Sequence, residues 1–423
     1  MIQTFQLSPG VTLRCFRDGR FKQGCLSVQL VRPMDSREAA MNALLGAVLL
    51  RGTRRHPSLR DITLALDDLY GASLSPLVRR VGDCQTTGLY CGFMDQRFAL
   101  PGDRVLEPMT DFLRQVLLDS PLERGAFLER FVESEKRNLI SAIECDRNDK
   151  QVYAMGRLLK LVCRHDSFGL PRLGEPEEVA AVTARGLYDH YQKILRESPV
   201  NLLYVGSAQP EEVAALLAPL FDLPGRAPLP IPAQTDLVPC PGAQVTETMD
   251  VTQSKLCLGF TTPITNRTAQ YPAMQLLNQV FGAGMTSKLF MNVREKQSLC
   301  YSIGSGYYGS KGIVTVSAGI DGANRDQAQE EILRQLALCA DGQITAEELT
   351  GAKEGILSGL RAAHDSPGAI EGYYSHAALN GLLVPPQEYM QCIAAVELPQ
   401  LAQAARTLTL HSTYFLTERR ADP

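Results

Sequence analysis

The sequence repeats one pattern of secondary structure in its two halves, and this repetition is the strongest constraint on its fold. In the first half, the alternating segment CLSVQLV (25–31) predicts a half-buried strand, and AAMNALLGAVLL (39–50) predicts a helix. In the second half, KLCLGFTT (255–262) predicts a strand, and YPAMQLLNQVF (271–281) predicts a helix that ends at glycine. Each half also closes with a further strand-like segment. The recurrence predicts an internal duplication of an α+β unit.

A proline-rich stretch, DLPGRAPLPIPAQTDLVPCPG (222–242), separates the two halves. Its six prolines lack backbone donors and favour an extended chain, which is typical of a semi-rigid linker. We therefore expect an N-terminal domain over 1–221, a linker over 222–242 and a C-terminal domain over 243–423. The predicted fold class is α+β, with two homologous domains that are each a mixed β-sheet with helices packed on one face.

Composition and charge exclude several classes of function. The chain has 423 residues, 45 % of them hydrophobic, and a net charge of −4, which argues against binding to a nucleic-acid backbone. It contains no apolar run of about 18 residues, and its start lacks the basic and apolar regions of a secretory signal. Its 11 cysteines include no C-x-x-C pair, which favours free thiols in a reducing compartment. We expect a cytoplasmic protein with no nucleic-acid or membrane partner.

Three segments together indicate a known family. They are LLRGTRRHPSLRDITLALDDLYGASLS (49–75), the run from HDSFGLPRLGEPEEV to the end of the first half (165–221), and GAGMTSKLFMNVREKQSLCYSIGSGYYGSKGIVTVSAGID (282–321). In this order they resemble the pitrilysin/insulinase metallopeptidases, which include mitochondrial processing peptidase. The resemblance covers nearly the whole chain. It also extends to relatives without a zinc motif that occur in bacterial operons linked to modification of elongation factor P, a role that no residue here explains physically.

Catalytic members of that family carry H-x-x-E-H on the first helix and a second glutamate on a later one. The two histidines and the later glutamate hold zinc with one open position for water, and the remaining glutamate takes a proton from that water. When RGT (51–53) is aligned with the family, the first three functional positions fall on Ala43, Gly46 and Ala47, and the later glutamate falls near Ala142. None of these side chains can bind a metal. The resemblance therefore implies no catalytic residue and no metal in this chain.

The second half keeps a segment that the resemblance associates with substrate. In the family, an arginine and a tyrosine within the segment matching REKQSLCYS reach the substrate, and they correspond here to Arg294 and Tyr301. A guanidinium can hold a peptide carbonyl or carboxylate, and a tyrosine hydroxyl can donate to an oxyanion. Both residues also have a structural explanation. A cation is favoured near a helix end, and a tyrosine at the start of a strand is typically a packing residue.

The resemblance implies that two different chains supply the zinc site and the substrate-binding residues. In two-chain members, one subunit carries the zinc, and the other lacks it and supplies the arginine and the tyrosine. We therefore predict a non-catalytic subunit of a heterodimeric zinc peptidase, whose partners are a zinc-bearing homologue and a peptide enclosed in a chamber. Zinc is expected only in the partner, and the chain alone is not expected to be active. Two alternatives stay open: a stand-alone peptide-binding or scaffold protein, and a peptidase whose metal site is rebuilt from residues distant in sequence.

Overall fold

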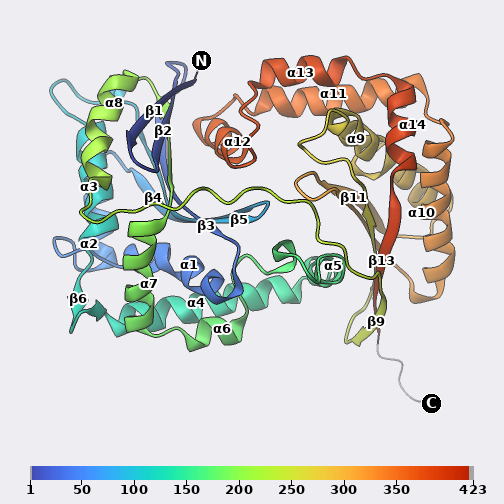
Figure 1. The fold of residues 1–423 in the computed structure, drawn as a ribbon, viewed down its shortest axis with the longest axis horizontal. Coiled ribbons are helices and arrows are strands. Elements are labelled where there is room, and N and C mark those ends of the chain that lie inside the picture. Colours follow the sequence, from blue (N-terminus) through green and yellow to red (C-terminus); the bar gives the residue numbers. More distant parts are fainter. Residues whose placement is uncertain (1, 419–423) are drawn as a thin grey trace. The chain divides into compact units, whose positions relative to one another are not determined.

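The computed structural model describes residues 2–418, which divide into two compact units (Figure 1). Unit 1 contains the chain up to Glu144, then Leu170–Ala233 and Ala363–Leu383. Unit 2 contains Cys145–Gly169, Gln234–Ala362 and the chain from Val384 onward. The units therefore differ from the predicted domains 1–221 and 243–423 at two segments, because each half of the sequence supplies one helical segment to the other unit.

Unit 1 is built on a six-stranded sheet in the order β1-β2-β8-β3-β5-β4. Strands β2 and β8 pair in parallel and the remaining neighbours pair antiparallel, so the sheet is mixed. The strands of this unit, including a two-stranded hairpin of β6 and β7, are β1 (Ile2–Ser8), β2 (Val11–Arg17), β3 (Gln23–Pro33), β4 (Ser73–Val81), β5 (Cys84–Met94), β6 (Leu122–Glu123), β7 (Ala126–Phe127) and β8 (Val200–Gly206).

The helices of unit 1 are α1 (Ser36–Leu49), α2 (Leu59–Asp68), α3 (Leu106–Leu118), most of α4 (Glu129–Asn148), α6 (Pro176–Ala181), α7 (Ala184–Glu197), α8 (Pro210–Leu217) and α12 (Pro367–Leu379). Helix α1 begins after Asp35, whose carboxylate caps the helix by accepting a hydrogen bond from the Arg37 backbone N–H. The main core lies between α1, α3, α7 and one face of the sheet.

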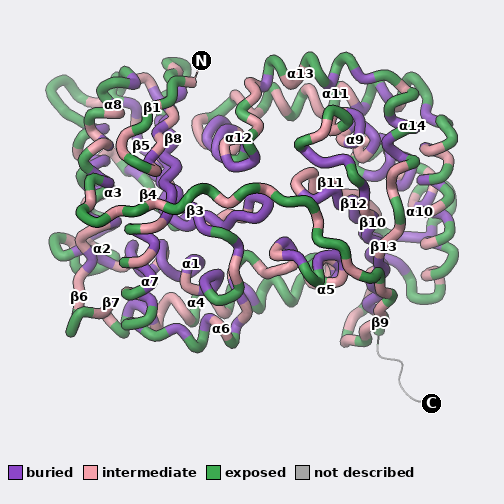
Figure 2. The backbone as a smooth tube through the Cα atoms, in the orientation of Figure 1, coloured by how far each residue is buried: buried purple, intermediate pink, exposed green. Residues whose placement is uncertain are grey.

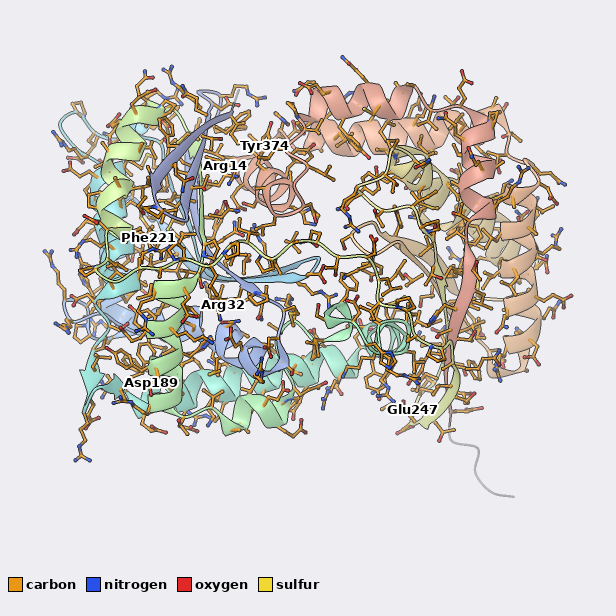
Figure 3. All side chains as sticks on the ribbon, in the orientation of Figure 1. Arg14, Arg32, Asp189, Phe221, Glu247 and Tyr374 are labelled. Atoms are coloured by element: carbon orange, nitrogen blue, oxygen red, sulfur yellow. The ribbon has the colours of Figure 1, made fainter. Side chains whose placement is uncertain are left out.

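Helix α12 comes from the second half of the sequence and packs on strands β3 and β8. Leu26, Val28 and Leu30 of β3 lie in the main core, whereas Cys25 joins Tyr374 of α12 in a second cluster, because successive side chains of a strand point to opposite faces. Tyr374 is labelled on α12 in Figure 3. Strand β3 is consequently buried along nearly its whole length, as Figure 2 shows, and not half-buried as its alternation predicted.

Unit 2 has a five-stranded mixed sheet in the order β11-β12-β10-β13-β9, in which only β13 and β9 pair in parallel. Its strands are β9 (Gln244–Met249), β10 (Ser254–Thr261), β11 (Ser302–Tyr308), β12 (Ile313–Ile320) and β13 (Thr409–Glu418). Its helices are α5 (Lys150–Val162), α9 (Tyr271–Asn278), α10 (Arg325–Ala340), α11 (Ala346–Ala362), α13 (Pro386–Ala394) and α14 (Leu398–Arg406).

Helix α5 packs on the sheet of unit 2, as α12 packs on the sheet of unit 1. It comes from the first half of the sequence and packs on β10 and β13. A Cβ at Gly259 would lie 2.7 Å from Cγ2 of Val162, so glycine permits this close approach. The predicted α+β class with two sheet-and-helix units is confirmed, with the addition that one helix from the other half covers the second face of each sheet.

The connection between the halves is exposed or partly exposed from Asp222 to Gly242, as expected for its proline content (Figure 2). All eleven cysteines are free thiols. Between residues 2 and 418, no helix is both long and apolar enough to cross a bilayer.

Candidate functional site

Helix α1 carries the three positions that correspond to the zinc motif. Ala43 and Gly46 are buried and Ala47 is partly exposed, whereas Ala142 is exposed on α4. Within residues 2–418, no group of three histidine, cysteine, aspartate or glutamate side chains could hold a metal ion.

The glycine at the position of the family's general base lets α1 pack closely on the sheet. A Cβ at Gly46 would lie 2.9 Å from the carbonyl oxygen of Gly88 in β5 and 3.1 Å from Cβ of Pro76 in β4. The backbone of β5 therefore occupies the space in which a side chain at position 46 would begin. A glutamate could not be restored at this position without moving α1 or β5.

We expect Gly46→Ala to lower the free energy of unfolding by about 1 kcal/mol or more, because overpacking a core costs about 1 to 3 kcal/mol. The helix propensity of alanine offsets only part of that cost. Urea denaturation would measure the change. Gly156→Ala is the matched control, since Gly156 lies in α5 with open space around its Cβ position. The control should gain about 0.5 to 1 kcal/mol, and a similar gain at Gly46 would contradict the close packing.

A chain of buried hydrogen bonds holds α1 to α7 and to β5. His190 Nε2 lies 2.7 Å from Oδ1 of Asn42, and Asn42 Nδ2 donates to Oε1 of Gln85 at 2.8 Å. Gln85 in turn donates to the carbonyl oxygen of Ala39 at 3.2 Å. Our sequence analysis singled out none of these residues. The one available signal was Asn42, a polar residue within the apolar run of the predicted helix.

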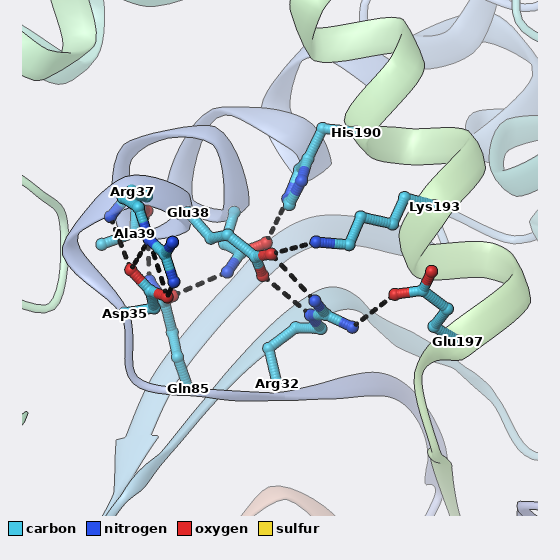
Figure 4. Close-up of polar contacts among 10 residues, drawn as sticks. Arg32, Asp35, Arg37, Glu38, Ala39, Gln85, His190, Lys193 and Glu197 are labelled. Atoms are coloured by element: carbon cyan, nitrogen blue, oxygen red, sulfur yellow. Dashed lines mark hydrogen bonds and ion pairs between the residues drawn. The ribbon is translucent and has the colours of Figure 1, made fainter. Parts of the chain in front are cut away.

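Beside this chain lies a cluster of charged residues (Figure 4). The guanidinium of Arg32 donates to both oxygens of Glu38 at 2.8 and 2.9 Å, and Lys193 Nζ donates to Oε1 at 2.7 Å. Burial by itself raises the pKa of Glu38, but the hydrogen bonds from Arg32 and Lys193 lower that pKa overall. Arg32 also lies 3.6 Å from Glu197. These contacts fix the start of α1 on β3 and α7.

His190 makes the stability of the folded chain depend on pH. Burial lowers the pKa of His190 to about 4, below its usual value of about 6.5. The unfolded chain therefore takes up a proton at a higher pH than the folded chain does, and stability falls as the pH decreases from about 6.5 towards 4.

For this histidine we expect a loss of about 2 kcal/mol of unfolding free energy between pH 7.5 and pH 5. Urea midpoints measured at both pH values would show the loss, which should be smaller in His190→Gln by about that amount. An equal slope in His190→Gln and in the wild type would refute the role given to His190.

Arg294 and Tyr301 lie on one segment of unit 2, next to the terminal strand β11. Arg294 is in a π-helical segment, Leu289–Lys296, with its guanidinium 4.7 Å from the centre of the Phe290 ring and its side chain 39 % exposed. The backbone N–H of Tyr301 donates to Gly319 of β12 at 2.8 Å, and the residue is 66 % exposed. Tyr301 is therefore not the packing residue that its place before a strand suggested.

Comparisons with known proteins agree with this fold. Residues 181–356 match the family described as the peptidase M16 inactive domain. The probable inactive metalloprotease YmfF of Bacillus subtilis is 28 % identical over 96 % of each chain. An uncharacterized zinc protease of Rickettsia felis is 23 % identical over 72 % of this chain and 74 % of its own.

Among solved structures, a conserved protein from Enterococcus faecalis V583 has a TM-score of 0.92 and 27 % identity, with full coverage of both chains. A peptidase M16 inactive domain from Pseudomonas fluorescens has a TM-score of 0.82 at 16 % identity, over 100 % of this chain and 99 % of that one, which is evidence for the fold alone.

The positions of the zinc motif hold alanine and glycine. The resemblance to the pitrilysin/insulinase metallopeptidases is confirmed, because part of the chain matches the peptidase M16 inactive domain and nearly the whole chain is similar to a probable inactive metalloprotease.

Proposed function

We propose that the chain is the non-catalytic subunit of a two-chain zinc peptidase. Its partner would be a homologue that carries the zinc motif, and the two chains would enclose a peptide substrate. One contrast supports this proposal: α1 holds alanine and glycine where a peptidase needs zinc ligands and a general base, while Tyr301 and part of Arg294 are exposed in unit 2.

Each subunit has its own chemical task in this proposal. Zinc in the partner supplies an activated water. In this chain, the planar fork of Arg294 binds a carbonyl or carboxylate of the peptide. The hydroxyl of Tyr301 donates a hydrogen bond to the oxygen that becomes negative as water attacks.

The test is to purify the chain alone and together with the zinc-bearing homologue from the same genome. We expect almost no zinc in the chain alone, and a heterodimer with one zinc ion when the two are mixed, measured by metal analysis and light scattering. A monodisperse monomer that ignores the homologue would refute the proposal. Peptide binding that needs no partner would favour a stand-alone binding protein. Stoichiometric zinc in the chain alone would favour a rebuilt metal site.

A further inference from the structure

The π-helical segment that carries Arg294 is attached to helix α10 of the same unit by a chain of polar side chains. Asn292 Nδ2 donates to Oε1 of Gln335 on α10 at 2.9 Å, and Gln335 Nε2 donates to Oε1 of Glu331 at 2.6 Å. Lys296 Nζ donates to Oδ1 of Asn292 at 3.0 Å. Gln335 and Glu331 are both buried. The contact between Asn292 and Gln335 therefore holds the segment on α10 through a shielded hydrogen bond.

Charged groups at both ends of this chain fix the direction of its hydrogen bonds. Arg334 donates to both carboxylate oxygens of Glu331 at 2.8 Å, and chiefly these bonds lower the pKa of Glu331 to about 2. Glu331 is therefore a carboxylate that can only accept, so Gln335 turns its NH₂ group to Glu331 and its oxygen to Asn292. The ammonium of Lys296 can only donate, so Asn292 turns its oxygen to Lys296 and its NH₂ group to Gln335. Each amide has one orientation that satisfies both of its neighbours.

The backbone around Arg294 has an unusual conformation that needs such support. Residues Leu289–Lys296 are π-helical, a conformation that is rare and is frequent at functional sites. Ser298 follows with a φ of 51°, in the left-handed region that favours glycine, and its N–H donates to the carbonyl oxygen of Arg294 at 3.0 Å. A residue in this region costs energy and persists only where the surrounding structure holds it. The hydrogen bonds to α10 provide a hold of this kind.

We propose that Asn292 and Gln335 are positioning residues for Arg294, which keep its guanidinium in one place before a peptide binds. The inference rests on the proposed function, in which Arg294 contacts the peptide, and it adds two residues that act through Arg294. The guanidinium lies 4.7 Å from the centre of the Phe290 ring in the same segment, so its position follows that of the segment. A group that is already held in place loses less freedom when it binds.

The first experiment measures hydrogen exchange in the whole chain, without a partner. Asn292→Asp removes the donor of the central bond and keeps the size of the side chain. Gln335 cannot turn its amide to donate to this aspartate without aiming its oxygen at the Glu331 carboxylate. We expect the backbone amides of Leu289–Lys296 to exchange about tenfold faster, because one buried hydrogen bond is lost. Gln335→Met removes the acceptor of the same bond and should have the same effect.

Asn138→Asp is the matched control, since the Asn138 amide donates to Glu135 on the same helix, α4, at an exposed position of unit 1. It should leave exchange in Leu289–Lys296 unchanged. Unchanged exchange in both Asn292→Asp and Gln335→Met would overturn the proposal. Because this measurement uses the chain alone, its result does not depend on whether the heterodimer forms.

The second experiment uses the two-chain peptidase and separates positioning from a general structural defect. Asn292→Asp should lower kcat/KM about tenfold, since a displaced contact positions the substrate less well. The same change should have no further effect in a chain that already carries Arg294→Ala, because the two residues act as one unit. An equal loss in both backgrounds, or no loss in either, would overturn the positioning role. Failure of the pair to form would instead refute the proposed function, whatever the exchange measurement shows.

Discussion

Replacing Arg79 with leucine is expected to lower the free energy of unfolding by about 3 to 5 kcal/mol, the usual cost of leaving one charge of a buried pair without its partner. The side chain of Glu371 is fully buried and would keep hydrogen bonds only from neutral groups, Gln29 Nε2 at 3.2 Å and Ser375 Oγ at 2.8 Å. Because Glu371 lies on α12, the loss would weaken the attachment of that helix to the sheet. Urea denaturation followed by circular dichroism would measure it.

Two further variants separate this effect from a general loss of arginine. Arg104 makes an exposed ion pair with Glu107, so Arg104→Leu should cost much less stability than Arg79→Leu. The double variant Arg79→Leu/Glu371→Leu removes both charges and should recover much of the stability lost in the single variant. If Arg79→Leu cost no more than Arg104→Leu, the pair would not be an important stabilising contact.

In the two-chain peptidase that we propose, Tyr301→Phe is expected to lower kcat by about 10²- to 10³-fold, the effect of removing one hydrogen-bond donor to an oxyanion. Arg294→Ala should lower peptide turnover as well, because it removes a contact that positions the substrate. Both side chains are at least partly exposed, so neither change should affect folding or assembly. Steady-state kinetics and light scattering on the same samples would test both points.

Arg361→Ala provides the control for these two variants, because Arg361 is an exposed arginine near the end of α11. Its turnover should equal that of the unchanged pair. Unchanged turnover in Arg294→Ala and Tyr301→Phe would limit both residues to a structural role, and it would remove the chemical argument for this chain as a substrate-binding subunit.

Much of the fold was accessible from the sequence because the duplicated pattern of strands and helices is local. The sequence does not reveal that α5 and α12 each belong to the unit built mainly from the other half of the chain. The stretch AFLERFVESEKRNLISAIECDRND (126–149) immediately precedes α5, and nothing in its periodicity shows that the chain then passes into unit 2. An apolar stripe predicts that a helix is covered, but it does not predict by which sheet.

The candidate site was likewise only partly predictable from the sequence. The alignment of RGT located Ala43, Gly46 and Ala47, and the structure places all three on α1 as expected. The contacts around them join residues that are far apart in the chain. Asn42 and His190 are 148 positions apart, and Arg79 and Glu371 are 292 apart. No local pattern pairs such residues, so the polar contacts that fix α1 and α12 became visible only in the folded chain.

The exchange of helices has a consequence for synthesis on the ribosome. Unit 1 needs α12, so it can be completed only after residue 379 has been made, although its sheet is finished by Gly206. Until then, Phe16, Cys25, Leu203 and Val205 have no helix to cover them. A fragment that ends in the proline-rich stretch would expose this apolar surface and would be prone to aggregate. The duplicated halves are thus two units in architecture, and we expect them to behave as a single unit in folding.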